Sequence, residues 1–234
     1  MNLFYITGTS SGIGFALANL LLKDSNNIVI GLSRRNNIEH KNYHHIIHDL
    51  SLPVPVGILE PLDETYKKIV LINNAGQVGP VSSLGKHTFE EINENYFVNL
   101  IAPSLLSNDF IEAYKSHSAL KMIINVSSGA AKYPIKSWST YCSSKAGLDM
   151  LSLVIQEENP EFKVYAIAPG IVDTEMQSAI RNAKKEDFPD LDRFIEYKNQ
   201  GELSDANQVA KKFLKIIQNP DLFNETICSV RDID

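Results

Sequence analysis

A serine, a tyrosine and a lysine in the second half of the chain are suited to acid–base chemistry: Ser128, Tyr141 and Lys145. If residues 138–157 form a helix, the four-residue step from Tyr141 to Lys145 puts the phenol and the ammonium on one face, one turn apart. A free tyrosine has a pKa of about 10 and donates its proton poorly at neutral pH, but a neighbouring cation lowers that pKa. The spacing therefore predicts an acidic phenol that can transfer a proton.

A glycine-rich segment near the start of the chain follows an apolar run and precedes a helical pattern, the context expected of a phosphate-binding turn. Gly8 allows a tight exit from the strand, Gly12 lets a pyrophosphate approach the backbone, and Gly14 lets the helix pack closely on the sheet. The helix N-terminus would stabilise the anion. The spacing G-x-x-x-G-x-G predicts a dinucleotide site, with a structural glycine turn as the alternative. The residues expected to contact the cofactor here are Gly8, Ser10, Ser11, Gly12, Ile13 and Gly14.

Two arginines, Arg34 and Arg35, end the second apolar run, where an NAD-specific fold carries an acidic residue for the ribose 2′-hydroxyl. A guanidinium can bind a 2′-phosphate through two hydrogen bonds and stack on adenine, so the pair favours NADPH over NADH as the cofactor. Two solvated arginines are the alternative. Asp49, after the third run, could accept a hydrogen bond from the adenine amino group or could be a plain turn carboxylate.

Short apolar runs alternate with helical patterns along the whole chain, which predicts a parallel sheet covered by helices on both faces. Strands are expected at residues 3–7, 28–32, 68–73, 121–127 and 163–168, with weaker ones at 44–48 and 226–230. Helices are expected at residues 12–23, 89–115, 138–157 and 205–218, and Pro103 is expected to bend or end part of the second. Asn74, Ala75 and Gly76 leave a strand where the strand order should reverse, the crevice in which such sheets bind ligands.

Two regions are less regular. Residues 51–66 hold three prolines, so we expect a shortened helix with an extended entry there. Residues 173–204 are charged and poorly periodic, and they are interpreted as an excursion outside the sheet that could form a lid over the substrate.

The composition indicates one domain, residues 1–234, because 234 residues with 44% hydrophobic content suffice for one substantial core. A net charge of −6 argues against nucleic-acid binding, and no apolar run approaches the roughly 20 residues of a membrane span. The two cysteines form no disulfide framework, so a reducing cytoplasm is expected. The clustered histidines, His40, His44, His45 and His48, have no carboxylate or cysteine at ligand spacing, and no metal site is expected.

Taken together, these motifs resemble the short-chain dehydrogenase/reductase family. The resemblance rests on the glycine segment, Asn73 to Gly76, Asn99, Ser128, Tyr141 with Lys145, and Pro169 with Gly170, and it covers nearly the whole chain. It implies a three-layer, doubly wound α/β Rossmann fold with seven parallel strands. It also implies a homodimer or homotetramer assembled through the helices at residues 89–115 and 138–157.

The resemblance also implies a role for each motif residue. Ser128 would hold the substrate carbonyl, Tyr141 would protonate it, and Lys145 would bind the nicotinamide ribose and lower the pKa of the tyrosine. Asn99 would anchor a water relay behind the lysine. Besides the residues already named, Tyr141, Lys145, Pro169, Gly170, Val172 and Thr174 would contact the cofactor.

Within the family, the segments at residues 129–132, 137–150 and 169–176 are similar to bacterial benzil reductases and sepiapterin reductases. This similarity implies reduction of a small-molecule carbonyl compound such as a 1,2-diketone, with Trp138 and Met176 beside the substrate. Trp138 could instead pack between helix and lid. Many NADPH-preferring members carry a basic residue where this chain has Ser11, so the NADPH preference depends mainly on Arg34. The alternatives are a redox-sensing regulator that binds NADPH without turnover and a general ketone or 3-oxoacyl reductase.

Overall fold

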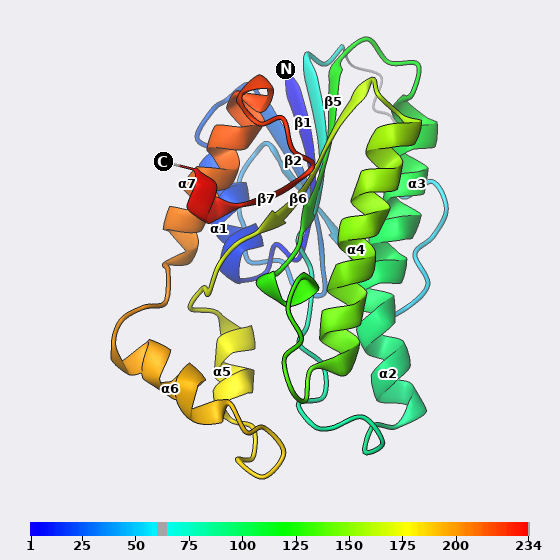
Figure 1. Cartoon of the computed structure of the whole chain (residues 1–234). Helices are drawn as coiled ribbons and strands as arrows, with labels where there is room; N and C mark the ends of the chain where they lie inside the picture. Colours follow the sequence, from blue (N-terminus) through cyan, green and yellow to red (C-terminus); the bar gives the residue numbers. More distant parts are fainter. Residues whose placement is uncertain (60–64, 234) are drawn as a thin grey trace.

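The computed structural model describes residues 1–59 and 65–233. Within them, seven parallel strands form one sheet in the order β3-β2-β1-β4-β5-β6-β7, with helices on both faces (Figure 1). This is the predicted doubly wound Rossmann fold. The strands are β1 (Asn2–Thr7), β2 (Asn27–Ser33), β3 (Tyr43–Ile47), β4 (Lys68–Asn73), β5 (Leu120–Val126), β6 (Phe162–Ala168) and β7 (Ile227–Ser229).

The longer helices are α1 (Gly12–Leu21), α2 (Phe89–Tyr96), α3 (Ala102–Tyr114), α4 (Ser139–Glu158), α5 (Glu175–Arg181), α6 (Leu191–Asn199) and α7 (Ala206–Gln218). Short turns of helix follow α2, β5, α7 and β7: η1 (Phe97–Ile101), η2 (Gly129–Ala131), η3 (Pro220–Leu222) and η4 (Val230–Asp232). None of the helices among the described residues is long and apolar enough to cross a membrane.

The sheet divides the hydrophobic core into two layers. Along β1, Phe4 and Ile6 pack into the cluster that contains α1 and α7, whereas Leu3 and Tyr5 pack into the cluster that contains α3. Because successive side chains of a strand point to opposite faces, a strand buried on both sides is apolar at nearly every position. This is why the sequence marks the strands clearly.

The strand order reverses between β1 and β4, which are direct neighbours although two strands separate them along the chain. The residues that follow these two strands, the glycine-rich segment and Asn74, therefore meet at the same edge of the sheet. Such a reversal opens a crevice at the carboxyl ends of the strands, where doubly wound folds bind ligands.

The segment predicted as a helix over residues 89–115, bent or partly ended at Pro103, is divided just before that proline. α2 begins with a capping box between Thr88 and Glu91 and ends at Tyr96, the π-helical turn η1 follows, and α3 continues from Ala102. Pro103 lies in the first turn of α3, where its missing N–H is tolerated. The α-helix is therefore interrupted before the proline, and the interruption is the wider π-helical turn.

Residues 173–204 lie outside the sheet, as predicted, but they are more regular than expected because they contain α5 and α6 (Figure 1). The base of this segment is closed by backbone hydrogen bonds from Asp173 N to Ser204 O and from Ser204 N to Ile171 O. In the other irregular region, residues 51–59 form turns and no helix, and residues 60–64 of the predicted short helix lie outside the described residues.

Candidate active site

A cavity of about 690 Å³ runs along the carboxyl edge of the sheet, over the point where the strand order reverses. Most of the predicted site residues line it, although they come from seven separate parts of the chain. Gly14 and Asn99 do not line it and lie directly behind its wall. The predicted residues that line the cavity are Gly8, Ser10, Ser11, Gly12, Ile13, Arg34, Arg35, Asp49, Asn74, Ala75, Gly76, Ser128, Trp138, Tyr141, Lys145, Pro169, Gly170, Val172, Thr174 and Met176.

The glycine-rich segment has the backbone shape that its glycines predict. Gly8 and Gly12 have φ angles of +74° and +59°, which side chains other than hydrogen disfavour. A Cβ on Gly14 would lie 2.4 Å from both Gly8 O and Asn74 Nδ2, so only glycine lets α1 approach β1 this closely. Asn74 Nδ2 donates to Thr7 O at 2.9 Å and thereby ties the end of β4 to the end of β1.

Arg34, Arg35 and Asp49 meet at one end of the cavity. Hydrogen bonds from the backbone and hydroxyl of Ser51 lower the pKa of Asp49, and the positive charge of Arg34 adds to the effect. Asp49 is thus a turn carboxylate that also lines the cavity, and its contact with adenine stays a prediction. His48, which was not predicted from the sequence as a site residue, lines the same end.

A buried polar cluster supports this end from behind. Thr9 Oγ1 is hydrogen-bonded to Tyr43 Oη at 2.8 Å and to Ser33 Oγ at 3.2 Å, and His45 Nδ1 to Tyr43 Oη at 2.9 Å. The cluster joins the glycine-rich segment to the ends of β2 and β3. A Cβ on Gly31 would lie 2.1 Å from Tyr43 Oη, so glycine in β2 makes room for the cluster.

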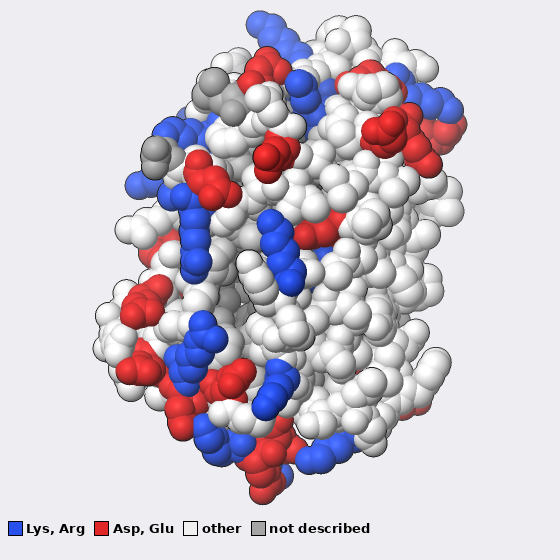
Figure 2. Space-filling model, viewed as in Figure 1, with Lys and Arg blue, Asp and Glu red and all other residues white. Residues whose placement is uncertain are grey.

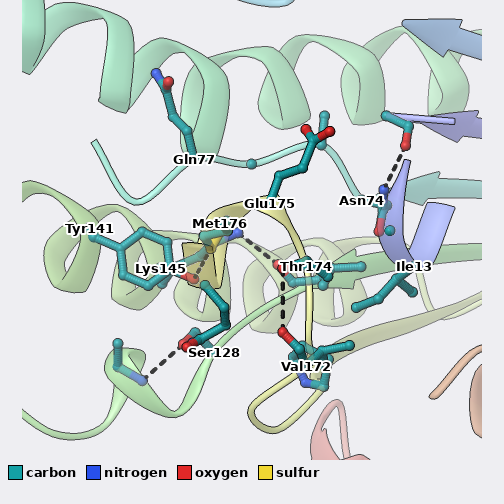
Figure 3. A pocket seen from close by; sticks show the side chains of 18 of the residues that line it. Ile13, Asn74, Gln77, Ser128, Tyr141, Lys145, Val172, Thr174, Glu175 and Met176 are labelled. Carbon is teal, nitrogen blue, oxygen red and sulfur yellow. Dashed lines mark hydrogen bonds between the residues drawn. The ribbon is translucent and has the colours of Figure 1, made fainter. Parts of the chain in front are cut away.

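Ser128, Tyr141 and Lys145 lie together in the middle of the cavity, beside Met176 (Figure 3). Tyr141 and Lys145 occupy one face of α4, as their spacing predicts, and the ammonium nitrogen lies 5.9 Å from the centre of the phenol ring. Lys145 Nζ donates to Val126 O at 2.8 Å. Tyr141 Oη donates to Met176 Sδ at 3.9 Å, and Ser128 Oγ accepts from Ala130 N at 3.2 Å.

The electrostatics of this group differ from the sequence expectation. Burial raises the pKa of Tyr141, while a hydrogen bond with Ser128 works in the opposite direction. Lys145 does not lower that pKa here, because its ammonium is directed to the Val126 carbonyl. Burial in turn lowers the pKa of Lys145 to about 8, although the nearby Asp149 carboxylate raises it. The phenol is therefore held in its protonated form at neutral pH.

Asn99 lies in the π-helical turn η1 and is fully buried. Its Oδ1 accepts from Gln77 N at 3.0 Å, and its Nδ2 donates to Gln77 O at 2.8 Å. Both Asn99 Oδ1 and Lys145 Nζ lie within 3.5 Å of the position that a Cβ on Gly76 would take. Asn99 is thus next to Lys145, with Gly76 in front of the pair.

The segment after β6 closes the cavity on its other side. Gly170 has a φ of +76°, and Thr174 Oγ1 donates to Val172 O at 3.4 Å, so the turn carries both predicted residues on one wall (Figure 3). Glu175 and Gln77 also line the cavity, although neither was predicted from the sequence. Each stands directly beside a recognised motif, which is the signal that could have found it.

Aromatic side chains surround the far end of the cavity. Trp138 stacks on Phe188 with ring centres 5.7 Å apart, and it meets the ring of Tyr141 edge-on at 5.5 Å. Trp138 lines the cavity and also packs against the 173–204 segment, while its contact with a substrate stays a prediction. Phe194 and Tyr197 of α6 line this end as well, and the weak periodicity of their segment gave no sign of it.

Comparisons with known proteins agree with this geometry. Residues 2–185 match the family model described as short chain dehydrogenase. A benzil reductase ((S)-benzoin forming) of Bacillus cereus is 37% identical, covering 94% of this chain and 96% of that protein. A sepiapterin reductase of Meriones unguiculatus is 36% identical, covering 68% of this chain and 61% of that protein. The crystal structure of the KRED1-Pglu enzyme matches with a TM-score of 0.82 at 25% identity, covering 92% of this chain and 94% of that one.

These matches confirm the predicted resemblance to benzil and sepiapterin reductases. The chain belongs to the short-chain dehydrogenase/reductase family, whose members are oxidoreductases that bind a nicotinamide cofactor.

Proposed function

We propose that this protein is an NADPH-dependent carbonyl reductase that acts on a 1,2-diketone or a related ketone. The observation that carries the proposal is the group formed by Ser128, Tyr141 and Lys145 in one cavity with the glycine-rich segment. The cavity thereby holds a proton donor, a second hydroxyl and a cation together with a turn of the kind that binds dinucleotides. This combination suits hydride transfer coupled to proton transfer.

The cavity fits a dinucleotide. Gly12, at the N-terminus of α1, presents backbone without a side chain where a pyrophosphate would lie. From there the cavity extends in one direction to Arg34 and in the other to Tyr141 and Lys145. Tyr141, Lys145 and the turn from Pro169 to Thr174 would hold the nicotinamide half, and the bound nicotinamide would supply a hydride.

The residues of the chain would carry out the proton transfer. Ser128 Oγ and Tyr141 Oη would both donate hydrogen bonds to the carbonyl oxygen, on which negative charge develops. Tyr141 would then give its proton to that oxygen. Because burial raises the pKa of this phenol, the proton is available throughout the neutral range, which suits reduction rather than alcohol oxidation. Lys145 would bind the nicotinamide ribose, and Asn99 would anchor a water relay behind it.

The preference for NADPH is inferred from the charges at the other end of the cavity. Arg34 and Arg35 follow β2 there. A guanidinium can pair with a 2′-phosphate through two hydrogen bonds, whereas a ribose hydroxyl gains more from an acidic partner.

The substrate class is inferred from the aromatic end of the cavity and from the relatives. Trp138, Phe194 and Tyr197 offer flat apolar surfaces, and Met176 lies against the phenol that would donate the proton. A substrate with aromatic groups beside its carbonyls fits this lining. Benzil has that chemistry, and the relatives named benzil reductase align along most of the chain.

The proposal is tested by following the oxidation of NADPH and NADH with benzil, other 1,2-diketones, simple ketones and a 3-oxoacyl thioester. We expect turnover of the diketones with NADPH and weaker turnover with NADH. Turnover of the thioester in preference to the diketones would indicate a general 3-oxoacyl reductase. Tight NADPH binding with no turnover across the panel would instead indicate a redox sensor.

We further propose that the protein is a homodimer or homotetramer assembled through the helices beside the site. Several large apolar side chains on η1, α3 and α4 are exposed, and the α4 side of the molecule carries few charges (Figure 2). An apolar helical flank of this kind is typical of a subunit interface. The residues concerned are Ile101, Leu105, Met150, Leu153 and Val154.

A further inference from the structure

A third ionisable side chain continues the catalytic face of α4. Tyr141, Lys145 and Asp149 follow one another at four-residue steps, so each lies about one turn beyond the last. All three are buried, with Asp149 only 7% exposed. The proposed reaction gives no role to this carboxylate, and a charged group is rarely buried without a partner.

Asp149 has a partner next to the proposed catalytic serine. Ser127 Oγ donates to Asp149 Oδ1, and both side chains are buried. Ser127 directly precedes Ser128, at the end of β5. The hydrogen bond therefore fixes the backbone from which Ser128 extends into the cavity, and it ties that backbone to the helix that carries Tyr141.

Asp149 also acts on Lys145. Its negative charge raises the pKa of Lys145 and so opposes the effect of burial. Burial raises the pKa of Asp149 itself, while the hydrogen bond from Ser127 and the positive charges of Lys132 and Lys145 act in the opposite direction. The charged or titratable groups near this carboxylate are Lys145 on α4, Lys132 after η2 and Cys228 on β7. Of these, Lys145 is the one that belongs to the cavity.

We propose that Asp149 is a positioning residue of this site: it keeps the ammonium of Lys145 charged and, through Ser127, holds the end of β5 that carries Ser128. It does not touch the substrate or the cofactor. The effect on Lys145 is independent of the reaction, whereas the effect on turnover rests on the proposed function. The two parts can therefore be tested separately.

The first test follows the titration of Lys145 by NMR of the protein labelled with ¹³C-lysine, with the signal assigned by Lys145→Arg. Asp149→Asn keeps the size of the side chain and an oxygen that accepts from Ser127, but it removes the charge. We expect the Lys145 signal to titrate at lower pH in this variant than in the wild type. Glu157→Gln removes one negative charge from an exposed position of the same helix and should leave the titration unchanged.

The second test follows kcat for benzil reduction against pH. Loss of a neighbouring opposite charge commonly costs a titrating group a factor of about ten or more in the ratio of its charged to its neutral form. The fall of kcat at high pH, the basic limb of the profile, should therefore occur at lower pH in Asp149→Asn than in the wild type. Relative to its value at neutral pH, kcat at pH 9 should be about tenfold lower in the variant than in the wild type. Asp149→Glu should restore the limb. Ser127→Ala removes the hydrogen bond that favours the ionised form of Asp149 but keeps the carboxylate, so it should lower kcat and move the limb less than Asp149→Asn does.

The outcomes distinguish the inference from the proposed function. If the Lys145 titration is the same in Asp149→Asn as in the wild type, the inference is overturned, whatever the enzyme reduces. If the titration moves as expected but the wild type reduces no carbonyl, the link between Asp149 and Lys145 stands and the proposed function fails. Asp149→Ser, smaller and also uncharged, takes the place of Asp149→Asn in the same titration if the latter does not fold.

Discussion

Lys145 is the residue at which function and stability conflict. It is buried at 3% exposure, and burial lowers its pKa from 10.5 to about 8. Keeping it charged at neutral pH therefore costs about 3 kcal/mol of folding free energy, at about 1.4 kcal/mol for each pKa unit. This free-energy cost already includes the attraction between Lys145 and Asp149. Strained or costly groups of this kind are commonly retained where activity needs them.

Replacement of this lysine by a neutral side chain should accordingly stabilise the protein. We expect Lys145→Met to raise Tm by several degrees at pH 7, since 1 kcal/mol is about 2–4 °C for a chain of this size. Between pH 8 and 10.5 the unfolded wild type holds the proton that the folded protein has lost, so wild-type stability rises with pH and the advantage of the variant shrinks.

Thermal melts of both proteins across this pH range check the prediction. Lys211→Met, at an exposed position of α7, is the control and should leave Tm unchanged. A lower Tm for Lys145→Met at pH 7 would contradict the balance described for Lys145.

Arg34 should set the preference between the two cofactors. A hydrogen bond to a charged group contributes about 1.5–3 kcal/mol, so Arg34→Ala should raise KM for NADPH by about 10- to 100-fold. The KM for NADH should rise much less, because NADH has no 2′-phosphate and loses only the stacking of Arg34 on adenine, and it therefore serves as the internal control. Initial rates with each cofactor measure both values, and an equal rise in the two would argue against the assigned role of Arg34.

Among the elements, the contact between α1 and β1 depends most on a single residue. At Gly14 a Cβ would overlap Gly8 O, a backbone atom that cannot move cheaply. Overpacking of this kind costs about 1–3 kcal/mol, which outweighs the gain of about 1 kcal/mol from placing alanine in a helix. Gly14→Ala should therefore lower Tm and weaken NADPH binding, because the start of α1 is pushed away from the cavity.

Differential scanning calorimetry and NADPH fluorescence titration measure the two effects. Gly129→Ala is the matched control for Tm, since a Cβ there meets no atom within 4 Å. If Gly14→Ala has the Tm and the NADPH affinity of the wild type, then glycine at position 14 is not needed for the close packing of α1 on β1.

The sequence predicts elements well where burial is symmetrical. β1 and β4 are apolar on both faces, and their bounds differ from expectation by at most one residue. It fails at η1, because a π-helical turn has no local sequence pattern distinct from that of an α-helix. It fails similarly in the 173–204 segment, whose helices bury their apolar residues against Trp138 and neighbouring aromatic rings rather than against the sheet.

In the site, too, the sequence predicts what local spacing determines and misses what depends on tertiary neighbours. Spacing was enough to predict that Tyr141 and Lys145 share a face of α4, and the reversal of strand order brings Asn74 to the glycine-rich segment. The direction in which Lys145 Nζ donates depends on the Val126 carbonyl, a tertiary neighbour that spacing does not reveal. That is why the expected effect on the pKa of Tyr141 was wrong.

For the whole molecule, the exposed apolar flank on η1, α3 and α4 predicts self-association. A glutamate there would place a charge at the centre of the interface, so Leu153→Glu should reduce the assembly to a smaller species. Light scattering coupled to size-exclusion chromatography measures the mass. Val56→Glu, at another exposed apolar position, should leave the mass of the wild type. A monomeric wild type would exclude the proposed assembly.

The most direct measurement is NADPH oxidation with benzil by the wild type and by Tyr141→Phe, together with the NADPH affinity of both. Phenylalanine keeps the ring that packs against Trp138 and removes only the hydroxyl that would donate the proton. We expect the wild type to consume NADPH in proportion to the diketone reduced. In the variant, kcat should fall by about 100-fold or more, with NADPH affinity nearly unchanged. Wild-type turnover that persists in Tyr141→Phe would contradict the assignment of Tyr141 as the proton donor.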